Sequence, residues 1–345
     1  MNPIRVMVVG AGILGRRHAR VFSEIEGARL VAVVDHSLER AATVAAPAGA
    51  QPFASIEAAL ENVECAAVAI ATPDHLHVEP VLSALSAGKH VLVEKPLATS
   101  VADAHSLIEA AARRNLVLQV NYSQRWVSEY AWIKEQITTG AIGRPLMIQS
   151  SKQDTMFVPT KMISWAAATS PIWFMSSHDI DLICWFIEDH VTEVNAREQR
   201  GVLEARGIAA HDGVDALLRF SRGATVALHS SWILPESYPT ITVDRMSIIG
   251  DIGMIEFESN GRRVSCYNAR GGKVVNFTGP QTANEVNGRI EGAFRQSLLS
   301  FLACVAGAPE APTSARHTLH VVEIQEAILQ AAARGTAMPL TRVYH

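Results

Sequence analysis

The strongest constraint on the fold is an alternation in the first 120 or so residues, where short apolar runs are separated by segments with helical periodicity. The apolar runs lie at Arg5–Val9, Leu30–Val34, Ala66–Ala71, His90–Val93 and Leu116–Val120. Helical periodicity is clearest at Ile13–Glu24, Ser37–Val44 and Val78–Ala87, and Ser100 is expected to cap a further helix, with Asp103 at capping-box spacing. Apolar strands that alternate with helices form parallel sheets covered on both faces. We therefore predict a doubly wound α/β domain at the N-terminus.

The pattern changes after about residue 123, where segments typical of β-strands follow one another with few helices between them. These segments are Leu146–Lys152, Val191–Arg197, Ala216–Phe220, Thr225–Trp232, Arg245–Ile249 and Met254–Phe257. Helices are predicted at Trp173–Phe186, Arg289–Val305 and Leu319–Ala333. The pattern indicates a second domain with a mostly antiparallel sheet and helices on one side. We place the domains at residues 1–122 and 123–345, and the last helix could pack back on the first domain.

A Gly-x-Gly-x-x-Gly motif joins the first predicted strand to the first predicted helix. Gly10 permits a tight turn, Gly12 lets the backbone approach a pyrophosphate, and Gly15 lets helix and strand pack closely. The N-terminus of the following helix attracts phosphate charge. We predict a Rossmann dinucleotide site here, with Ile13 and Leu14 among the residues that contact the cofactor.

The residue expected to choose the cofactor is Asp35, which ends the second apolar strand about twenty residues after Gly15. A carboxylate at this place accepts hydrogen bonds from the ribose 2′-hydroxyl and repels a 2′-phosphate. The next residues, His36 and Ser37, offer no arginine. NAD is therefore favoured over NADP.

Composition excludes several classes of partner. The 345 residues are 48% hydrophobic and 19% charged, as in a globular protein, and the net charge of -4 argues against nucleic acid. The 4 cysteines are far apart and form no Cys-x-x-Cys pair, so neither a metal site nor a disulfide framework is expected. The sequence shows no signal peptide and no apolar stretch that could span a membrane. We expect a cytoplasmic protein with a small-molecule partner and no membrane partner.

Two further segments, together with the glycine motif, resemble the glucose–fructose oxidoreductase/inositol dehydrogenase (Gfo/Idh/MocA) family. They are Ala71-Thr72-Pro73-Asp74-His75-Leu76-His77 and the run from Ala87 to Leu97, whose Glu94-Lys95-Pro96 element is the most specific part. Residues 140–143 and 178–181 also look like family landmarks. The resemblance implies a Rossmann domain followed by a domain on a large, open, mostly antiparallel sheet. It also implies oxidation of a secondary alcohol of a sugar, polyol or related compound, or the reverse reaction. Many members form dimers or tetramers through the open sheet face.

The resemblance also implies roles for particular side chains. Lys95 would hold and polarise the reacting oxygen, because an ammonium stabilises alkoxide charge as hydride leaves the carbon. His178 corresponds to the family's catalytic histidine, and an imidazole near neutrality can take and return the hydroxyl proton. Glu94 would orient Lys95 or the nicotinamide ribose. The remaining residues expected to contact the cofactor are Thr72, Pro73 and His77, with His77 near the nicotinamide.

The sequence departs from the family pattern at one position. Many family dehydrogenases carry an aspartate four residues before the catalytic histidine, where this chain has Phe174. Asp181 lies one helical turn after His178 and could share its face. Further candidates for lining the substrate pocket are Arg125, Gln153, Trp165 and Trp173.

Phe174 keeps two other functions open. Some relatives oxidise a sugar transiently with bound NAD to allow elimination or glycoside cleavage, as lyases or glycosidases that release no net NADH. Other relatives are sensors that bind the nucleotide and a sugar and catalyse nothing.

Overall fold

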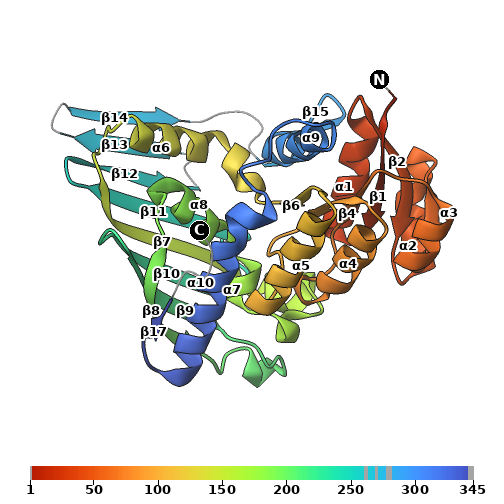
Figure 1. Cartoon of the computed structure of the whole chain (residues 1–345). Helices are drawn as coiled ribbons and strands as arrows, with labels where there is room; N and C mark the ends of the chain where they lie inside the picture. The colour runs from red at the N-terminus through yellow and green to blue at the C-terminus, as the bar shows by residue number, and fades with distance from the viewer. Residues whose placement is uncertain (1, 260–262, 269–270, 277–281, 341–345) are drawn as a thin grey trace. The chain divides into compact units, whose positions relative to one another are not determined.

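The computed structural model describes residues 2–259, 263–268, 271–276 and 282–340 (Figure 1). By its internal contacts the chain divides into two compact units. Residues 1–126 and 280–319 form the first, and residues 127–279 and 320–345 form the second. None of the described helices is both long enough and apolar enough to cross a membrane.

The first unit contains a six-stranded parallel sheet with the order β3-β2-β1-β4-β5-β6. Its strands are β1 (Ile4–Val9), β2 (Ala28–Val34), β3 (Gln51–Phe53), β4 (Ala67–Ile70), β5 (His90–Val93) and β6 (Leu118–Val120). Val9 pairs with both Val34 and Ile70, and Ile70 pairs with Val93, so the carboxyl ends of these strands are level. The predicted doubly wound parallel sheet is confirmed, and its strand order reverses between β1 and β4.

Five α-helices lie between these strands. They are α1 (Ile13–Glu24), α2 (Leu38–Ala45), α3 (Ile56–Asn62), α4 (Val78–Ser86) and α5 (Val101–Arg113). Three of them, α2, α3 and α5, begin at a serine cap. The side chains of Ser37, Ser55 and Ser100 each accept a hydrogen bond from the backbone N–H three residues on. The bounds predicted for α1 are confirmed, and those of α2 and α4 differ by a residue. The predicted cap at Ser100 is also confirmed.

A late helix, α9 (Ala293–Val305), groups with the first unit. Its apolar residues Phe294, Leu298 and Phe301 share a buried cluster with Val6 and Phe22. The division at residue 122 had assigned this helix to the second domain. The helix predicted from residue 289 was wrong in its first turn, because residues 289–291 form strand β16, paired with β15 (Asn284–Val286).

The second unit is built on a nine-stranded sheet with the order β14-β13-β12-β11-β7-β10-β9-β8-β17. The strands are β7 (Pro145–Thr155), β8 (Val191–Gln199), β9 (Gly213–Phe220), β10 (Thr225–Leu234), β11 (Thr242–Gly250), β12 (Gly253–Glu258), β13 (Arg263–Asn268), β14 (Gly271–Asn276) and β17 (Met338–Pro339). Neighbouring strands are antiparallel except β7 and β10, which are parallel. The predicted mostly antiparallel sheet is confirmed.

Helices cover one face of this sheet, as Figure 1 shows for α6 (Ser128–Thr138), α8 (Ser177–Ile187) and α10 (Ala315–Arg334). Along β9, buried Val214, Ala216 and Leu218 alternate with exposed Asp215 and Leu217. The second set lies on the uncovered face, because successive side chains of a strand point to opposite sides. The other short helices lie at Ala46–Ala48, Asp74–Leu76, Ser123–Trp126, Val158–Met162, Ala166–Ala168 and Glu204–Arg206.

The single helix predicted over Trp173–Phe186 was wrong. The structure has a short helix α7 (Pro171–Phe174) and then α8, with a break at Met175 and Ser176. The hydroxyl of Ser177 donates to the carbonyl of Trp173 at 2.6 Å, and the hydroxyl of Ser176 bonds to that of Ser230 on β10. Serine side chains that bond locally compete with the backbone ladder of a helix, and periodicity does not show this competition.

Candidate functional site

The chemistry-bearing residues of the first unit gather at the carboxyl edge of its parallel sheet. The glycine turn follows β1, Asp35 follows β2, Thr72 follows β4 and Lys95 follows β5. The strand order reverses between β1 and β4, and open α/β sheets bind ligands at such a reversal. The edge therefore has the topology of a dinucleotide site.

The three glycines of the turn have different physical reasons to be glycine. Gly10 has φ 96°, and a Cβ there would lie 2.6 Å from the carbonyl oxygen of Ala71. A Cβ on Gly15 would lie 1.7 Å from the oxygen of Gly10. A Cβ on Gly12 would meet no described protein atom within 4 Å, so the space beside it is open to a ligand. Ile13, the first residue of α1, is 60% exposed, so the start of this helix is accessible to a phosphate.

Asp35 is a buried carboxylate tied to the glycine turn. Its Oδ2 accepts from the backbone N–H of Ala11 at 2.8 Å, and its Oδ1 accepts from the N–H of Ser37 at 2.9 Å. Burial acts to raise the pKa of Asp35, but these two hydrogen bonds and the pairing with Arg40 outweigh it and lower the pKa. The carboxyl group therefore remains ionised at the place where a ribose hydroxyl would bind.

Arg40 was missed by the sequence reasoning. Its Nη2 lies 2.7 Å from Asp35 Oδ1, so an arginine does lie beside Asp35, although His36 and Ser37 offer none. The reason is geometric: α2 begins at Leu38, and its first turn brings Arg40 back over the end of β2. Arg40 lies three residues beyond Ser37, outside the stretch that follows the strand directly.

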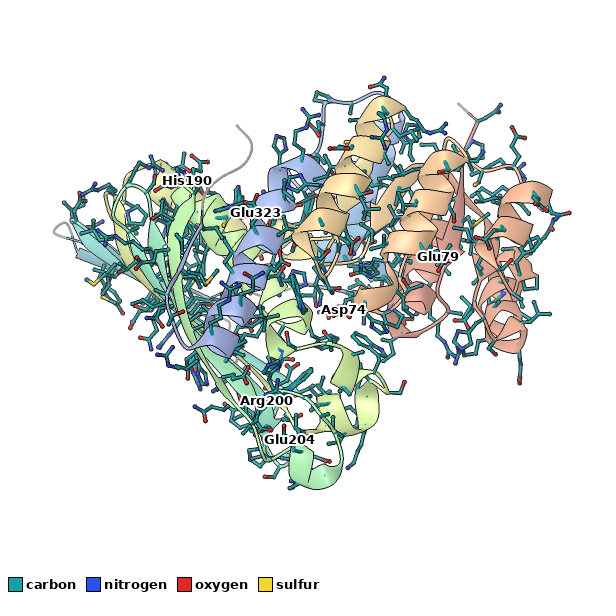
Figure 2. The ribbon with its side chains drawn as sticks, turned by 60° about the horizontal axis from the view of Figure 1, so that its bottom comes forward. Asp74, Glu79, His190, Arg200, Glu204 and Glu323 are labelled. Atoms are coloured by element: carbon teal, nitrogen blue, oxygen red, sulfur yellow. The ribbon has the colours of Figure 1, made fainter. Side chains whose placement is uncertain are left out.

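The loop after β4 is closed by His77. This residue is 1% exposed, and its Nδ1 lies 2.7 Å from the oxygen of Pro96 while its Nε2 lies 3.1 Å from the oxygen of Thr72. Burial lowers the pKa of His77, against the charge of Asp74 and the two carbonyls. Figure 2 labels Asp74, which lies shortly before α4. His77 thus links the loop after β4 to the segment that carries Lys95. A nicotinamide contact for it stays a prediction.

Lys95 is half-buried and lies between two buried neighbours. The carboxylate of Glu94 accepts from His18 Nε2 at 2.7 Å and from Asn121 Nδ2 at 2.7 Å. Burial acts to raise the pKa of Glu94, but these hydrogen bonds and the charges of His18 and Lys95 outweigh it and lower the pKa. His18 and Asn121 were not predicted. The available signal was a histidine among apolar residues on the buried face of α1.

His178 lies half-buried in the first turn of α8, in the second unit. The next residue, Asp179, is buried, and its Oδ2 lies 3.1 Å from Nζ of Lys152 on β7. Burial raises the pKa of Asp179 to about 6. The same burial acts to lower the pKa of Lys152, but the charges of Asp179 and Asp244 outweigh it and raise the pKa. This ion pair fixes the start of the helix that carries His178. Asp181 is also buried.

Phe174 lies in α7, on the other side of the break from His178. Its half-buried ring has its centroid 5.6 Å from that of Trp165 and 6.2 Å from that of Trp232. The three rings belong to an apolar cluster that includes Met156 and Met162. Phe174 therefore belongs to an aromatic wall and does not occupy the preceding turn of the helix that carries His178.

The remaining predicted pocket residues are dispersed. Arg125 donates from Nη1 to the oxygen of Pro312 at 3.1 Å in the first unit, and Trp173 is buried. Gln153 alternates with Lys152 along β7, so its side chain lies on the sheet face opposite to α8. The structure does not bring Gln153 to the side of the sheet that carries His178.

The sequence matches two family models that together cover most of the chain. Residues 4–122 match the oxidoreductase family with NAD-binding Rossmann fold, and residues 134–340 match its C-terminal α/β domain. An inositol 2-dehydrogenase of Saccharopolyspora erythraea is 33% identical over 199 residues, which are 57% of either chain. Two similar relatives are matched over 55% and 59% of their own length.

Matches over nearly the full chain are more distant. Another inositol 2-dehydrogenase of Saccharopolyspora erythraea is 27% identical over 98% of this chain and 95% of its own. A solved levoglucosan dehydrogenase in complex with NADH superposes with a TM-score of 0.87 at 21% identity, over 99% of this chain and 100% of its own. With both of its parts matched in order, the chain belongs to the Gfo/Idh/MocA oxidoreductase family with an NAD-binding Rossmann fold.

Proposed function

We propose that this protein is an NAD-dependent dehydrogenase acting on a secondary alcohol of a sugar, polyol or related cyclic compound, or on the corresponding ketone. The observation that carries the proposal is the shared edge of the parallel sheet. It joins the glycine turn and Asp35, which suit a dinucleotide, to Lys95, which suits an alcohol oxygen. The family match supports the same function.

The residues of the chain divide the chemistry between them. The start of α1 binds the pyrophosphate, and Asp35 accepts a hydrogen bond from a ribose hydroxyl. When bound, NAD supplies a hydride acceptor. Lys95 stabilises the negative charge on the alcohol oxygen as the C–H bond breaks, and His178 takes the hydroxyl proton. One hydride and one proton leave the substrate, which becomes a ketone.

We further propose that the substrate presents an apolar edge to Phe174. An aspartate at this position could accept a hydrogen bond from a second hydroxyl, whereas a phenyl ring packed against Trp165 cannot. A hydroxyl pressed against that ring would lose its partner at a cost of about 1–3 kcal/mol. A deoxy or anhydro compound, or the C–H face of a ring, fits this wall better than a simple polyol. The relatives named for inositol and for levoglucosan span both kinds of substrate.

The open face of the nine-stranded sheet supports a proposal about assembly. Met147 on β7, Leu217 on β9 and Ile249 on β11 alternate with buried residues and are 51%, 54% and 38% exposed. Apolar side chains on an uncovered sheet face are suited to burial against a second copy of the chain. We propose a homodimer or homotetramer formed through this face. Light scattering of the wild type and of Leu217→Glu tests it, and a wild-type monomer would refute it.

The test of the main proposal is the absorbance of NADH with a panel containing myo-inositol, glucose and levoglucosan. NADH formation is expected for at least one compound, and Lys95→Met should lower kcat by about a hundredfold or more while it retains NAD. Near-normal kcat in Lys95→Met would refute the role of this lysine. Substrate loss without NADH would identify a redox-recycling lyase or glycosidase. NAD binding with neither NADH formation nor loss of substrate would identify a sensor.

A further inference from the structure

The carboxylate of Glu94 is isolated from solvent. Glu94 is 5% exposed, and both of its hydrogen bonds reach the same oxygen, Oε1, from His18 on α1 and Asn121 after β6. Asn121 is held in turn, because Ser297 on α9 donates from Oγ to its Oδ1 at 2.7 Å. All four residues are at most 5% exposed. A carboxylate is thus fixed from three separate elements, directly before Lys95.

Among these four hydrogen-bonded residues, His18 makes no side-chain hydrogen bond to a described residue other than Glu94. Its ring is 0% exposed and packs against Phe294 on α9, with centroids 4.8 Å apart, and its Nδ1 has no hydrogen-bond partner in the described part of the chain. A buried histidine with one satisfied nitrogen is a costly way to fill a core, because an aliphatic residue would do so without a polar group. The hydrogen bond to Glu94 is therefore the feature that explains a histidine here.

The other side of Lys95 is fixed independently. The oxygen of Pro96 lies 2.7 Å from Nδ1 of His77. The backbone on the far side of the lysine is thus anchored whether or not Glu94 is in place. The backbone of Glu94 is anchored as well, because its N–H donates to the carbonyl oxygen of Ile70 at 2.9 Å. The hydrogen bonds from His18 and Asn121 therefore set the direction of the Glu94 carboxylate, and with it the surroundings of the Lys95 ammonium.

We propose that His18, with Asn121 as the second donor, is a positioning residue that sets the placement of Lys95 through Glu94. The inference rests on the proposed role of Lys95 in the reaction. His18 has no direct contact with substrate in this proposal. It keeps Glu94 ionised and directed away from the ammonium, so that Lys95 points to the alcohol oxygen and does not fold back on its neighbour. Displacement of a reacting group by about 1 Å can cost a hundredfold in rate.

Three single variants test the proposal. His18→Leu removes the donor and keeps the volume, and His18→Gln restores an N–H donor at similar reach. Phe294→Leu disturbs the same packing without touching the hydrogen bond. On the compound that gives the most NADH in the panel, we expect kcat to fall about a hundredfold in His18→Leu with the Kd of NAD changed less than about threefold. His18→Gln should recover most of the loss, and Phe294→Leu should keep kcat while losing thermal stability.

A double variant separates positioning from a general loss of structure. If His18 acts through Lys95, then His18→Leu should lower kcat no further once Lys95→Met is present. A further loss of the same size would overturn the proposal. Near-normal kcat in Lys95→Met alone would instead refute the proposed function.

A second measurement needs no turnover. The chain has six lysines, so carbon-13 reductive methylation, which keeps the charge, gives few signals, and Lys95→Arg identifies that of Lys95. In the presence of NAD this signal should shift in His18→Leu and return in His18→Gln. An unchanged signal in His18→Leu would overturn the proposal whatever the activity.

Discussion

Asp35 and Arg40 together are predicted to set the preference between NAD and NADP, and the structure gives the size of the effect. Oδ1 of Asp35 already accepts from Ser37 and from both Nε and Nη2 of Arg40, at 2.9, 3.2 and 2.7 Å. Oδ2 accepts only from Ala11 among the hydrogen bonds of the described residues. Since a carboxylate offers about four acceptor positions, the ribose hydroxyl is expected at Oδ2.

Loss of that hydrogen bond can be converted to a change in affinity. A hydrogen bond to a charged group contributes about 1.5–3 kcal/mol, which is roughly tenfold to a hundredfold in Kd. Asp35→Ser should therefore raise the Kd of NAD by about tenfold or more. The same variant removes the carboxylate that repels the 2′-phosphate of NADP. The preference for NAD should narrow by at least about tenfold, or 1.4 kcal/mol.

Arg40 should act in the opposite direction. Its side chain is 45% exposed, so its attraction for a 2′-phosphate is screened and amounts to about 1 kcal/mol. Arg40→Ala should weaken NADP by roughly fivefold and leave NAD nearly unchanged. Arg20→Ala is the matched control, because Arg20 is 41% exposed and also pairs with a carboxylate, that of Glu24. Calorimetric titration of both nucleotides is the assay. Tighter binding of NADP than NAD by the wild type would refute the reasoning about Asp35, and an unchanged Kd of NADP in Arg40→Ala would refute that about Arg40.

Three more outcomes are expected. The rate of alcohol oxidation should increase as pH rises through a pKa near neutrality, because only neutral imidazole accepts a proton. His178→Asn should flatten this rising part of the pH–rate profile and slow turnover about a hundredfold. An unchanged profile in the variant would place the base elsewhere. Wild-type activity on myo-inositol should be weak and should rise in Phe174→Asp if that variant folds, whereas vigorous wild-type oxidation unaltered by the substitution shows that the ring does not shape the pocket. Because burial raises the pKa of Asp179 to about 6, the folded state binds its proton more tightly than the unfolded chain. The stability that this group contributes is thus present below about pH 4 and lost as pH rises through about 6. Melting curves of Asp179→Asn should lose that part of the pH dependence. A pH profile identical to that of the wild type would contradict the raised pKa of Asp179.

Local patterns in the sequence were sufficient for most of the first unit. The helix Ile13–Glu24 and the cap at Ser100 depend on contacts within one turn, so periodicity and capping chemistry predict them. The glycine turn and Asp35 are also local signals, because each follows an apolar strand whose end is visible in the sequence. Their meeting at one edge follows from parallel strands with level carboxyl ends.

Tertiary structure decided what depends on distant partners. His18 and Glu94 are separated by 76 positions, and no spacing rule connects them. The break before α8 depends partly on the hydroxyl of Ser230, and the face to which Gln153 points depends on the register of β7 with its neighbours. Arg40 contacts Asp35 because α2 begins at Leu38 and its first turn returns toward the end of β2. The residues up to Ser37 carry no sign of this contact. The sequence determined by itself which local elements form and which residue types they carry, because short-range hydrogen bonds and side-chain periodicity govern both. Only the folded chain decided which polar groups share a buried hydrogen bond, since that depends on packing between elements far apart in the sequence.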